Sequence, residues 1–340
     1  MQASQRTPQR IQLITDVPVC WEDPHTLRWG FERAVARLHS PSAGQQRFVS
    51  ALRRGVDADR LNIEAMMVGA TLTDARAVID ALAPVTVAVE TVAVEPVTDG
   101  AEVQTPSADA RKLQPSALRA VVCQGARPSP ALKFGLLACG VRMIAESEGI
   151  DDSNWLRNPY AGVGGASDRK TAIAHADTAR EADLAVIVER YWDPLARADR
   201  WAMRGIPHLL VRFTDRAVVV GPLIVAGRGP CHTCLTLHRV AADGATAALA
   251  AQLSASAVAS ERGDAAVLAA AHIADYVRRW LAHDPSVHLT QTRITSPEAL
   301  HQASIDIETV SAHPECLCTT SPISATASRG RDAPREAISE

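Results

Sequence analysis

Apolar and polar positions change their spacing within the first part of the chain, and this change separates predicted strands from predicted helices. Short apolar runs at residues 18–21, 27–31 and 34–38 are joined by connectors with turn chemistry, such as Asp23-Pro24, which is the pattern of short strands. From Ser42 onward, apolar residues recur three or four positions apart, as on one face of a helix. Helices are predicted after Ser42, at 60–68 and at 73–82, with Ser42 and Thr73 as N-caps. This order predicts a small α+β domain over residues 11–85, with Trp21 and Trp29 in its core.

Residues 86–116 follow neither periodicity. They are rich in valine, threonine, glutamate, proline and aspartate, which predicts a linker with a mobile middle and a valine-rich start able to form a strand. Residues 321–340 are polar and rich in arginine, serine and alanine, which predicts a disordered tail.

Residues 117–320 alternate between largely apolar runs typical of buried strands and helical patterns, as expected of parallel strands joined by crossover helices. Buried strands are predicted at 118–123, 184–188, 208–213 and 217–225. Helices are predicted at 130–139, 168–182 and 194–203, and within the alanine-rich stretch 245–283, with an interruption around 261–264. Strands at 287–294 and 304–310 are expected to form an antiparallel pair. The predicted fold class is therefore α/β for this larger domain.

Composition narrows the class of protein further. The chain has 340 residues, is 47% hydrophobic and 21% charged, and carries a net charge of −3, which is ordinary for a globular protein. This near-neutral balance argues against a general nucleic-acid-binding or membrane-surface protein. The sequence contains no apolar run of the length that spans a bilayer, and residues 1–10 are polar. A cytoplasmic location is predicted, and cysteines in that reducing compartment favour metal binding over disulfides.

Four of the seven cysteines form two tight pairs, Cys231-x-x-Cys234 and Cys316-x-Cys318. Short loops of this kind deliver thiolates in twos to a tetrahedral zinc ion, and four thiolates leave no position open for water or substrate. A structural zinc site is predicted. The alternatives are unrelated buried thiols, or His232 or His313 in place of one cysteine. The three remaining cysteines lie in apolar settings and are predicted to be buried: Cys20, Cys123 and Cys139.

Several motifs recur in a characteristic order around these cysteines. In chain order they are Ala138-Cys-Gly-Val141, the segment 152–158 (which contains Asn154 and Arg157), the single residue Lys170, the tripeptide Gly205-Ile206-Pro207, and the segment 221–239, which contains the first cysteine pair. Together they resemble the ThiF/MoeB/HesA superfamily, whose members resemble ubiquitin-activating enzymes and adenylate carboxylates. The resemblance extends over residues 117–320 and is greatest to actinobacterial ThiF-like proteins, labelled cyclodehydratase or leader-peptide-binding proteins, of thiazole/oxazole-modified peptide biosynthesis. The first domain is similar to the PqqD-type winged-helix module for peptide recognition.

This resemblance implies a Rossmann-like ThiF-type domain with a zinc-stapled C-terminal part, in a protein that commonly forms homodimers. It also implies a nucleotide site, which would fall on Arg127, Glu148, Asn154, Arg157 and Lys170, and a magnesium-binding acid near Glu189 or Asp193. The family's glycine-rich turn falls on residues 124–129, however, where none of the three glycine positions is glycine and Pro128 has no N–H to donate. The missing glycines also count against a Rossmann-type dinucleotide protein.

Two functions therefore remain open. One is a catalytically degenerate ThiF-like zinc protein that binds a peptide or protein partner, either a leader peptide or a cyclodehydratase-type enzyme. In that case a peptide would add as a strand along residues 34–38. The alternative is an adenylyltransferase that uses ATP and magnesium to activate a C-terminal carboxylate, with arginine and lysine side chains holding the phosphates.

Overall fold

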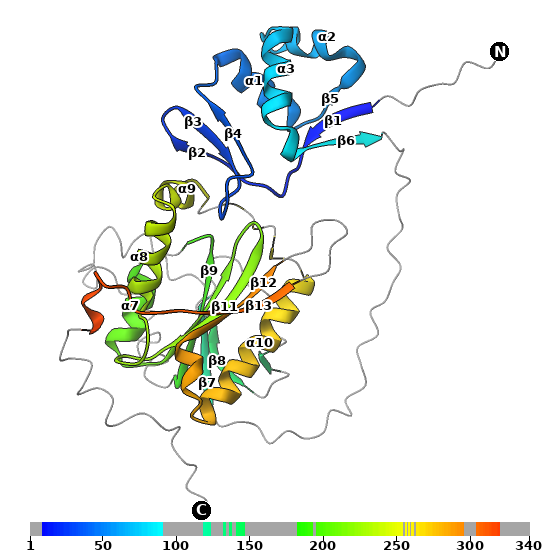
Figure 1. The fold of residues 1–340 in the computed structure, drawn as a ribbon. Helices are drawn as coiled ribbons and strands as arrows, with labels where there is room; N and C mark the ends of the chain where they lie inside the picture. Colours follow the sequence, from blue (N-terminus) through cyan, green and yellow to red (C-terminus); the bar gives the residue numbers. More distant parts are fainter. Residues whose placement is uncertain are drawn as a thin grey trace, which may run out of the picture. The chain divides into compact units, whose positions relative to one another are not determined.

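The computed structural model describes residues 9–90, 118–123, 132–133, 136–137, 141–146, 182–192, 195–253, 256, 258, 260–261, 263–295 and 304–319. The chain divides into two compact units. The smaller comprises Met1–Ala110 and Ala245–Ser256, and the larger comprises Arg111–Gly244 and Ala257–Glu340 (Figure 1). The predicted linker beyond residue 90, most of the helix predicted at 168–182, and the predicted tail lie outside the described residues.

The smaller unit contains the predicted succession of three strands and three helices. The strands β2 (Val19–Asp23), β3 (Thr26–Trp29) and β4 (Ala36–His39) form an antiparallel sheet in that order. The helices α1 (Ala43–Leu52), α2 (Leu61–Met67) and α3 (Leu72–Ala81) follow. A second sheet pairs β1 (Gln9–Leu13) with β5 (Val56–Asp57) and β6 (Thr86–Glu90), and short 3-10 turns occupy Ala58–Arg60 and Ala83–Val85. The valine-rich start of the predicted linker is thus strand β6.

The helix starts in this unit are set by capping residues. Ser42 is the N-cap of α1, as predicted: its hydroxyl accepts from the Gln45 N–H, and the Gln45 side chain in turn accepts from the Ser42 N–H. The prediction of Thr73 as a cap was wrong, because α3 begins after Thr71, which forms the same reciprocal pair with Asp74. Asp74 lies three residues after Thr71 and supplies the acceptor that completes a capping box.

The core of the smaller unit gathers the apolar faces of these elements. Trp29, Phe48 and Leu52 are fully buried, while Trp21 packs against the core and remains partly exposed. The prediction of a core position is therefore confirmed for Trp29 and only partly met for Trp21. Cys20 is buried as predicted.

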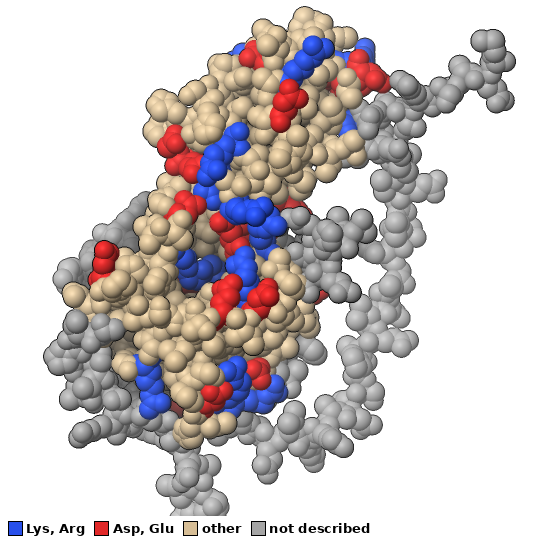
Figure 2. All heavy atoms as spheres, in the orientation of Figure 1, with Lys and Arg blue, Asp and Glu red and all other residues tan. Residues whose placement is uncertain are grey.

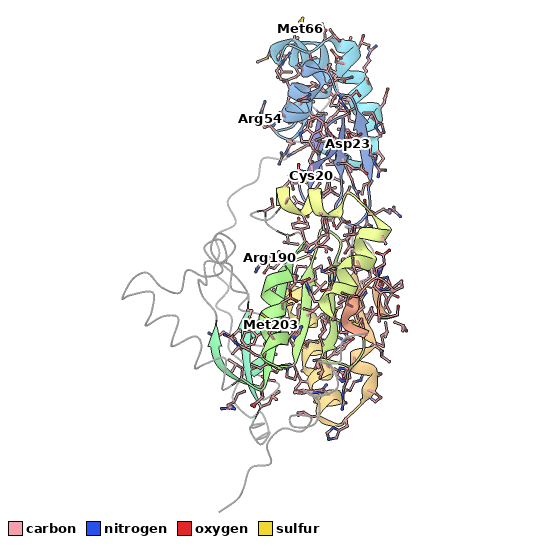
Figure 3. All side chains as sticks on the ribbon, turned by 90° about the vertical axis from the view of Figure 1, so that its left-hand side faces the viewer. Cys20, Asp23, Arg54, Met66, Arg190 and Met203 are labelled. Carbon is pink, nitrogen blue, oxygen red and sulfur yellow. The ribbon has the colours of Figure 1, made fainter. Side chains whose placement is uncertain are left out.

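A helix from much later in the sequence completes this unit. Helix α9 (Thr246–Leu253) packs on β2 and buries Leu249 and Leu253. Figure 3 labels Cys20 of β2 next to this helix, and the Cys20 Sγ lies 4.0 Å from the Leu249 carbonyl oxygen. The alanine-rich pattern predicted a helix here, but local periodicity carries no information about which distant strand a helix contacts.

The larger unit is built on a seven-stranded sheet with the order β13-β12-β11-β10-β9-β7-β8. Its parallel half consists of β7 (Arg119–Cys123), β8 (Arg142–Glu146), β9 (Leu184–Arg190) and β10 (His208–Phe213). Its antiparallel half consists of β11 (Ala217–Ile224), β12 (Thr290–Thr295) and β13 (Ser304–Thr309). The described helices are α7 (Leu195–Met203), α8 (His232–Ala242) and α10 (Gly263–Leu281), with 3-10 turns at Pro285–His288 and Leu317–Thr319. The mixed α/β class is therefore as predicted.

Burial explains why the sequence revealed the central strands so clearly. Every residue of β10 and β11 is buried, and Cys123 at the end of β7 is buried as well. Strands covered on both faces are mostly apolar along their whole length, whereas half-exposed strands alternate apolar and polar residues. The strand predicted from residue 287 begins only at Thr290, because Asp284 accepts from the Ser286 N–H and starts a 3-10 turn at Pro285.

The strand order also identifies the place where α/β folds bind ligands. Strand β7 lies between β8 and β9, so the chain leaves β7 toward one side and returns on the other. Ligands of open α/β sheets bind at such a switch point, outside the carboxyl ends of the strands. Glu189 and Arg190 close β9 at this end. No helix among the described residues has the length and apolar character needed to cross a membrane.

Candidate metal centre and adjacent charge network

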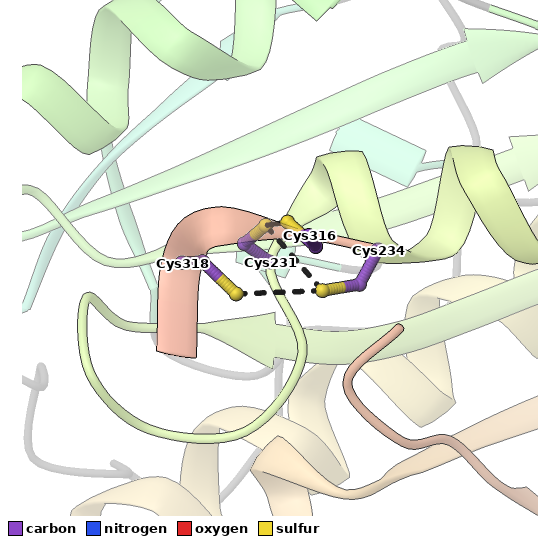
Figure 4. A group of neighbouring side chains, drawn as sticks. All are labelled: Cys231, Cys234, Cys316 and Cys318. Carbon is purple, nitrogen blue, oxygen red and sulfur yellow. Dashed lines mark hydrogen bonds between the residues drawn. The ribbon is translucent and has the colours of Figure 1, made fainter. Parts of the chain in front are cut away.

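Four cysteines of the larger unit converge on one point (Figure 4). Cys231 is the N-cap of α8 and Cys234 lies in its first turn, so their side chains are three residues apart on one helix face. Cys316 and Cys318 come from the segment after β13, where the Cys316 N–H donates to the His313 carbonyl at 3.0 Å. The two predicted pairs are therefore brought together from distant parts of the chain.

The sulfur positions fit a tetrahedral ion. The Sγ atoms of Cys231 and Cys234 are 3.7 Å apart, those of Cys231 and Cys316 are 3.6 Å apart, and those of Cys234 and Cys318 are 3.4 Å apart. All four sulfurs lie within 4.8 Å of one another. A tetrahedron with metal–sulfur bonds of about 2.3 Å has sulfur–sulfur edges of about 3.8 Å. The four cysteines could thus hold a metal ion such as zinc.

The surroundings of the sulfurs make a cation favourable. Burial raises the pKa of the Cys231 thiol and of the Cys318 thiol, because a lone thiolate is costly away from water. Burial acts in the same direction on Cys234, but hydrogen bonds from the backbone at His313 and Cys231 outweigh it and lower the pKa of this thiol. A thiophilic cation bound by all four sulfurs would stabilise them as thiolates.

Neither histidine replaces a cysteine in this cluster. His232 directs Nε2 to the Glu189 carboxylate, and the His313 Nδ1 accepts from the Glu315 N–H at 3.2 Å. The histidine alternative to a four-cysteine site is therefore not supported among the described residues.

A buried charge network lies directly beside the cysteines and was not predicted as a unit. Glu189 is fully buried, and its carboxylate accepts from the Arg212 Nε at 2.9 Å and contacts the His232 Nε2 at 2.5 Å. The Arg239 Nη1 lies 3.9 Å from the same carboxylate. The sequence did contain a signal, since Glu189 and Arg212 are charged residues at the ends of otherwise apolar strands.

This network keeps its carboxylate ionised. Burial alone would raise the pKa of Glu189, yet the positive charge of Arg212 and the contact with His232 lower it to about 2. His208 is buried nearby, and burial lowers its pKa to about 4, so it is neutral near pH 7. A buried ion pair of this kind is costly to break, because the remaining partner would be left charged and unpaired.

The predicted magnesium position at Glu189 has a different use in this fold. Both of its carboxylate oxygens are taken by Arg212 and His232, and the neighbouring Arg190 forms a two-pronged pair with Glu261 at 2.7 and 2.5 Å. The charged side chains described at the carboxyl end of β9 thus bond within the protein. The other magnesium candidate, Asp193, lies outside the described residues, as does Cys139. The same holds for all five predicted nucleotide-site residues: Arg127, Glu148, Asn154, Arg157 and Lys170.

The described surface is mixed in charge. Positive and negative side chains lie next to each other on the face of each unit that Figure 2 shows.

Comparison with known proteins gives matches of fold only. No protein-family model matches the sequence, and no curated protein matches it. The heterocyclase TruD aligns over 91% of the chain with 15% identity and a TM-score of 0.39, and the chain spans 42% of the length of TruD. Escherichia coli MccB with ATP aligns over 90% of the chain and 98% of its own length, with 12% identity and a TM-score of 0.37. MccB, the microcin C7 biosynthetic enzyme, in complex with N-formylated MccA aligns over 91% of the chain and 99% of its own length, with 11% identity and a TM-score of 0.36. At these values the matches establish neither an activity nor a ligand.

Proposed function

We propose that this protein binds an extended peptide segment on its smaller unit and that its larger unit is a zinc-stapled, catalytically degenerate ThiF-like scaffold. The peptide would be a leader segment or part of a cyclodehydratase-type enzyme, in the biosynthesis of thiazole/oxazole-modified peptides. The observation that carries the proposal is the outer edge of strand β4, which can accept a further strand. The resemblance of the sequence to ThiF-like and PqqD-type proteins supports it.

Hydrogen-bond alternation shows which β4 groups face outward. The Ser40 N–H donates to the His25 carbonyl at 2.6 Å, which makes this a hydrogen-bonded pair of the antiparallel ladder. Such pairs alternate with pairs whose main-chain groups point away from each other. The next pair, Thr26 with His39, is of the second kind, so the N–H and C=O of His39 point toward the outer edge. Strand β4 is the last strand of its sheet, and an extended peptide could bond there in the manner of strand addition.

The four-cysteine site has a structural role in this proposal. Zinc held by four thiolates is fully coordinated, so it supplies cross-linking and no open position for chemistry. It would fasten the start of α8 to the segment that follows β13. His232 lies between two ligands in sequence and bonds to Glu189, which connects this staple to the buried network at the end of β9.

Catalytic degeneracy is supported by two independent features. The sequence at 124–129 lacks the motif glycines that would let backbone N–H groups approach phosphates. The acid at the end of β9, Glu189, bonds to Arg212 and His232 rather than standing open to a metal ion. Both features remove parts that an adenylating site needs for binding nucleotide and magnesium.

A peptide-binding assay tests the proposal. Peptides of about twenty residues would be selected from a display library against the full chain, and the selected peptide measured by fluorescence anisotropy. His39→Pro removes one outward N–H of β4, that of His39, without removing a ladder bond to β3. We expect His39→Pro to weaken binding at least tenfold, while His39→Ala keeps the N–H and stays within threefold of the unaltered protein. Equal binding by both variants would place the peptide elsewhere.

The alternative function is adenylation of a C-terminal carboxylate with ATP and magnesium. Arg157 and Lys170 in the sequence favour it, since cations can hold phosphates where glycines are lacking. ATP–pyrophosphate exchange by the purified protein, together with calorimetric titration of ATP, separates the two functions. Clear exchange would overturn the scaffold function, and no binding at millimolar ATP would overturn the enzyme. Sedimentation equilibrium tests the homodimer that the family resemblance implies.

A further inference from the structure

The sheet β2-β3-β4 has a second edge, along β2, and the outward main-chain groups of one residue in it, Trp21, are bonded. The Gly30 N–H donates to the Pro18 carbonyl at 2.9 Å, so residues 18 and 30 form a hydrogen-bonded pair. By alternation, the pair of Trp21 with Leu27 is of the other kind, and the N–H and C=O of Trp21 point outward from the sheet. This places Trp21 on the β2 edge in the position that His39 has on the β4 edge.

A glutamine side chain bonds to both outward groups of Trp21. The Gln252 Oε1 accepts from the Trp21 N–H at 2.9 Å, and the Gln252 Nε2 donates to the Trp21 carbonyl at 2.8 Å. A residue of a neighbouring strand makes the same two bonds with its own C=O and N–H. The carboxamide has the chemistry of a peptide group, so Gln252 stands in for one residue of a paired strand.

The helix that carries Gln252 holds this amide in one orientation. The Gln252 Nε2 also donates to the Ala248 carbonyl one turn earlier at 2.9 Å, so both amide hydrogens are used. Reversing the amide would set NH₂ against the Trp21 N–H and oxygen against two carbonyls. Leu249 and Leu253 are buried and fix α9 against β2. Gln252 itself is exposed, so a competing strand could reach the edge from solvent if this side chain were removed.

We infer that Gln252 is a specificity-determining residue that blocks the β2 edge at Trp21 in place of a strand, so that of the two edges of this sheet only β4 accepts an added strand. The restriction of strand addition rests on the proposed peptide-binding function. The blocking of Trp21 by Gln252 does not depend on that function. Open strand edges pair readily with other chains, and proteins commonly block them. Here the block comes from a helix that the sequence places between α8 and α10 of the larger unit, and it leaves the edges of one three-stranded sheet unequal.

Amide hydrogen exchange tests the blocking of Trp21 directly. Gln252→Met keeps side-chain length and helix propensity but cannot bond to Trp21, and Ala247→Met, at an exposed position of α9, is the matched control. We expect the Trp21 amide to exchange at least tenfold faster in Gln252→Met and at the unaltered rate in Ala247→Met. Gln252→Glu keeps the acceptor for the Trp21 N–H and should restore part of the protection. An unchanged Trp21 rate in Gln252→Met would overturn the blocking of Trp21 by Gln252.

A strand probe tests the restriction to β4. The probe is a capped heptapeptide of alternating valine and threonine between terminal lysines, added to the full chain during exchange. We expect it to slow Trp21 exchange only in Gln252→Met. Slowing of Trp21 in the unaltered protein, or none in Gln252→Met, would overturn the restriction. The proposed function is tested separately. If the selected peptide does not slow exchange of the His39 amide, the proposed peptide-binding function is wrong.

Discussion

At the scale of single residues, Gly221 shows how one missing side chain permits the antiparallel half of the larger sheet. Its φ is +95°, and a Cβ there would lie 2.7 Å from the Tyr276 Oη and 2.9 Å from the Thr290 carbonyl oxygen. We expect Gly221→Ala to lower the free energy of unfolding by about 2–5 kcal/mol, through backbone strain and crowding together. Gly205→Ala is the control, because its φ is +66° but nothing lies within 4 Å. Gly205→Ala should lower the free energy of unfolding by about 1–2 kcal/mol, measured by urea unfolding. Equal losses in the two variants would refute crowding at Gly221.

His208 carries a pH dependence at the same scale. Burial lowers the pKa of its imidazole to about 4, below its value of 6.5 in an unfolded chain. The unfolded chain therefore takes up a proton first as the pH falls. The stability that the protein has with His208 neutral is complete above pH 6.5, and it is lost as the pH falls from 6.5 to 4. The loss reaches about 3 kcal/mol. Urea unfolding across this pH range should show a shallower slope for His208→Gln. Identical slopes would mean that His208 titrates normally in the folded protein.

At the scale of elements, the start of α3 shows which local signals decide a helix boundary. Thr71 and Thr73 are both good capping residues, but only Thr71 has an acid three positions on, and their bonds measure 3.0 and 3.1 Å. We expect Thr71→Ala to cost about 1 kcal/mol and Thr73→Ala less than about 0.5 kcal/mol. Thermal unfolding of the two variants checks this, and the reverse order would contradict the assigned boundary.

Elements were predictable from sequence where their own periodicity decided them. The run 208–213 is strand β10 residue for residue, because burial on both faces favours a mostly apolar strand, here with only His208 and Arg212 polar. The pairing of β1 with β6 and the docking of α9 on β2 were not predictable, since both depend on contacts between distant segments. The cysteine cluster was predictable because its chemistry fixes the spacing of its ligands. The Glu189 network was not, because its partners come from separate elements.

At the scale of the whole molecule, the sequence predicted the fold class and the cysteine cluster better than it predicted what each site does. Two features were predictable from the sequence: the absence of glycine at the three motif positions within 124–129, and the cluster of four cysteines. Only the structure shows which charged side chains pair with other residues of the protein, as Glu189 and Arg190 do. The blocking of the β2 edge at Trp21 likewise depends on a contact between residues 21 and 252, which no local pattern contains.

A metal ion held by the four cysteines would tie distant parts of the larger unit together, so its loss should destabilise the whole unit. Structural zinc with cysteine ligands contributes on the order of 10 kcal/mol of binding free energy, which a folded chain gains and an unfolded one lacks. We expect Cys231→Ser and Cys316→Ser to lose the single bound metal, measured by mass spectrometry of the metal content. Their melting temperature should fall by roughly 10 °C or more, at about 2–4 °C per kcal/mol for a unit of this size. Cys123→Ser is the matched control, a buried cysteine outside the cluster, and should keep its metal. Full metal content in both cluster variants would show that these four sulfurs do not share an ion, and the pairs would then be ordinary buried thiols.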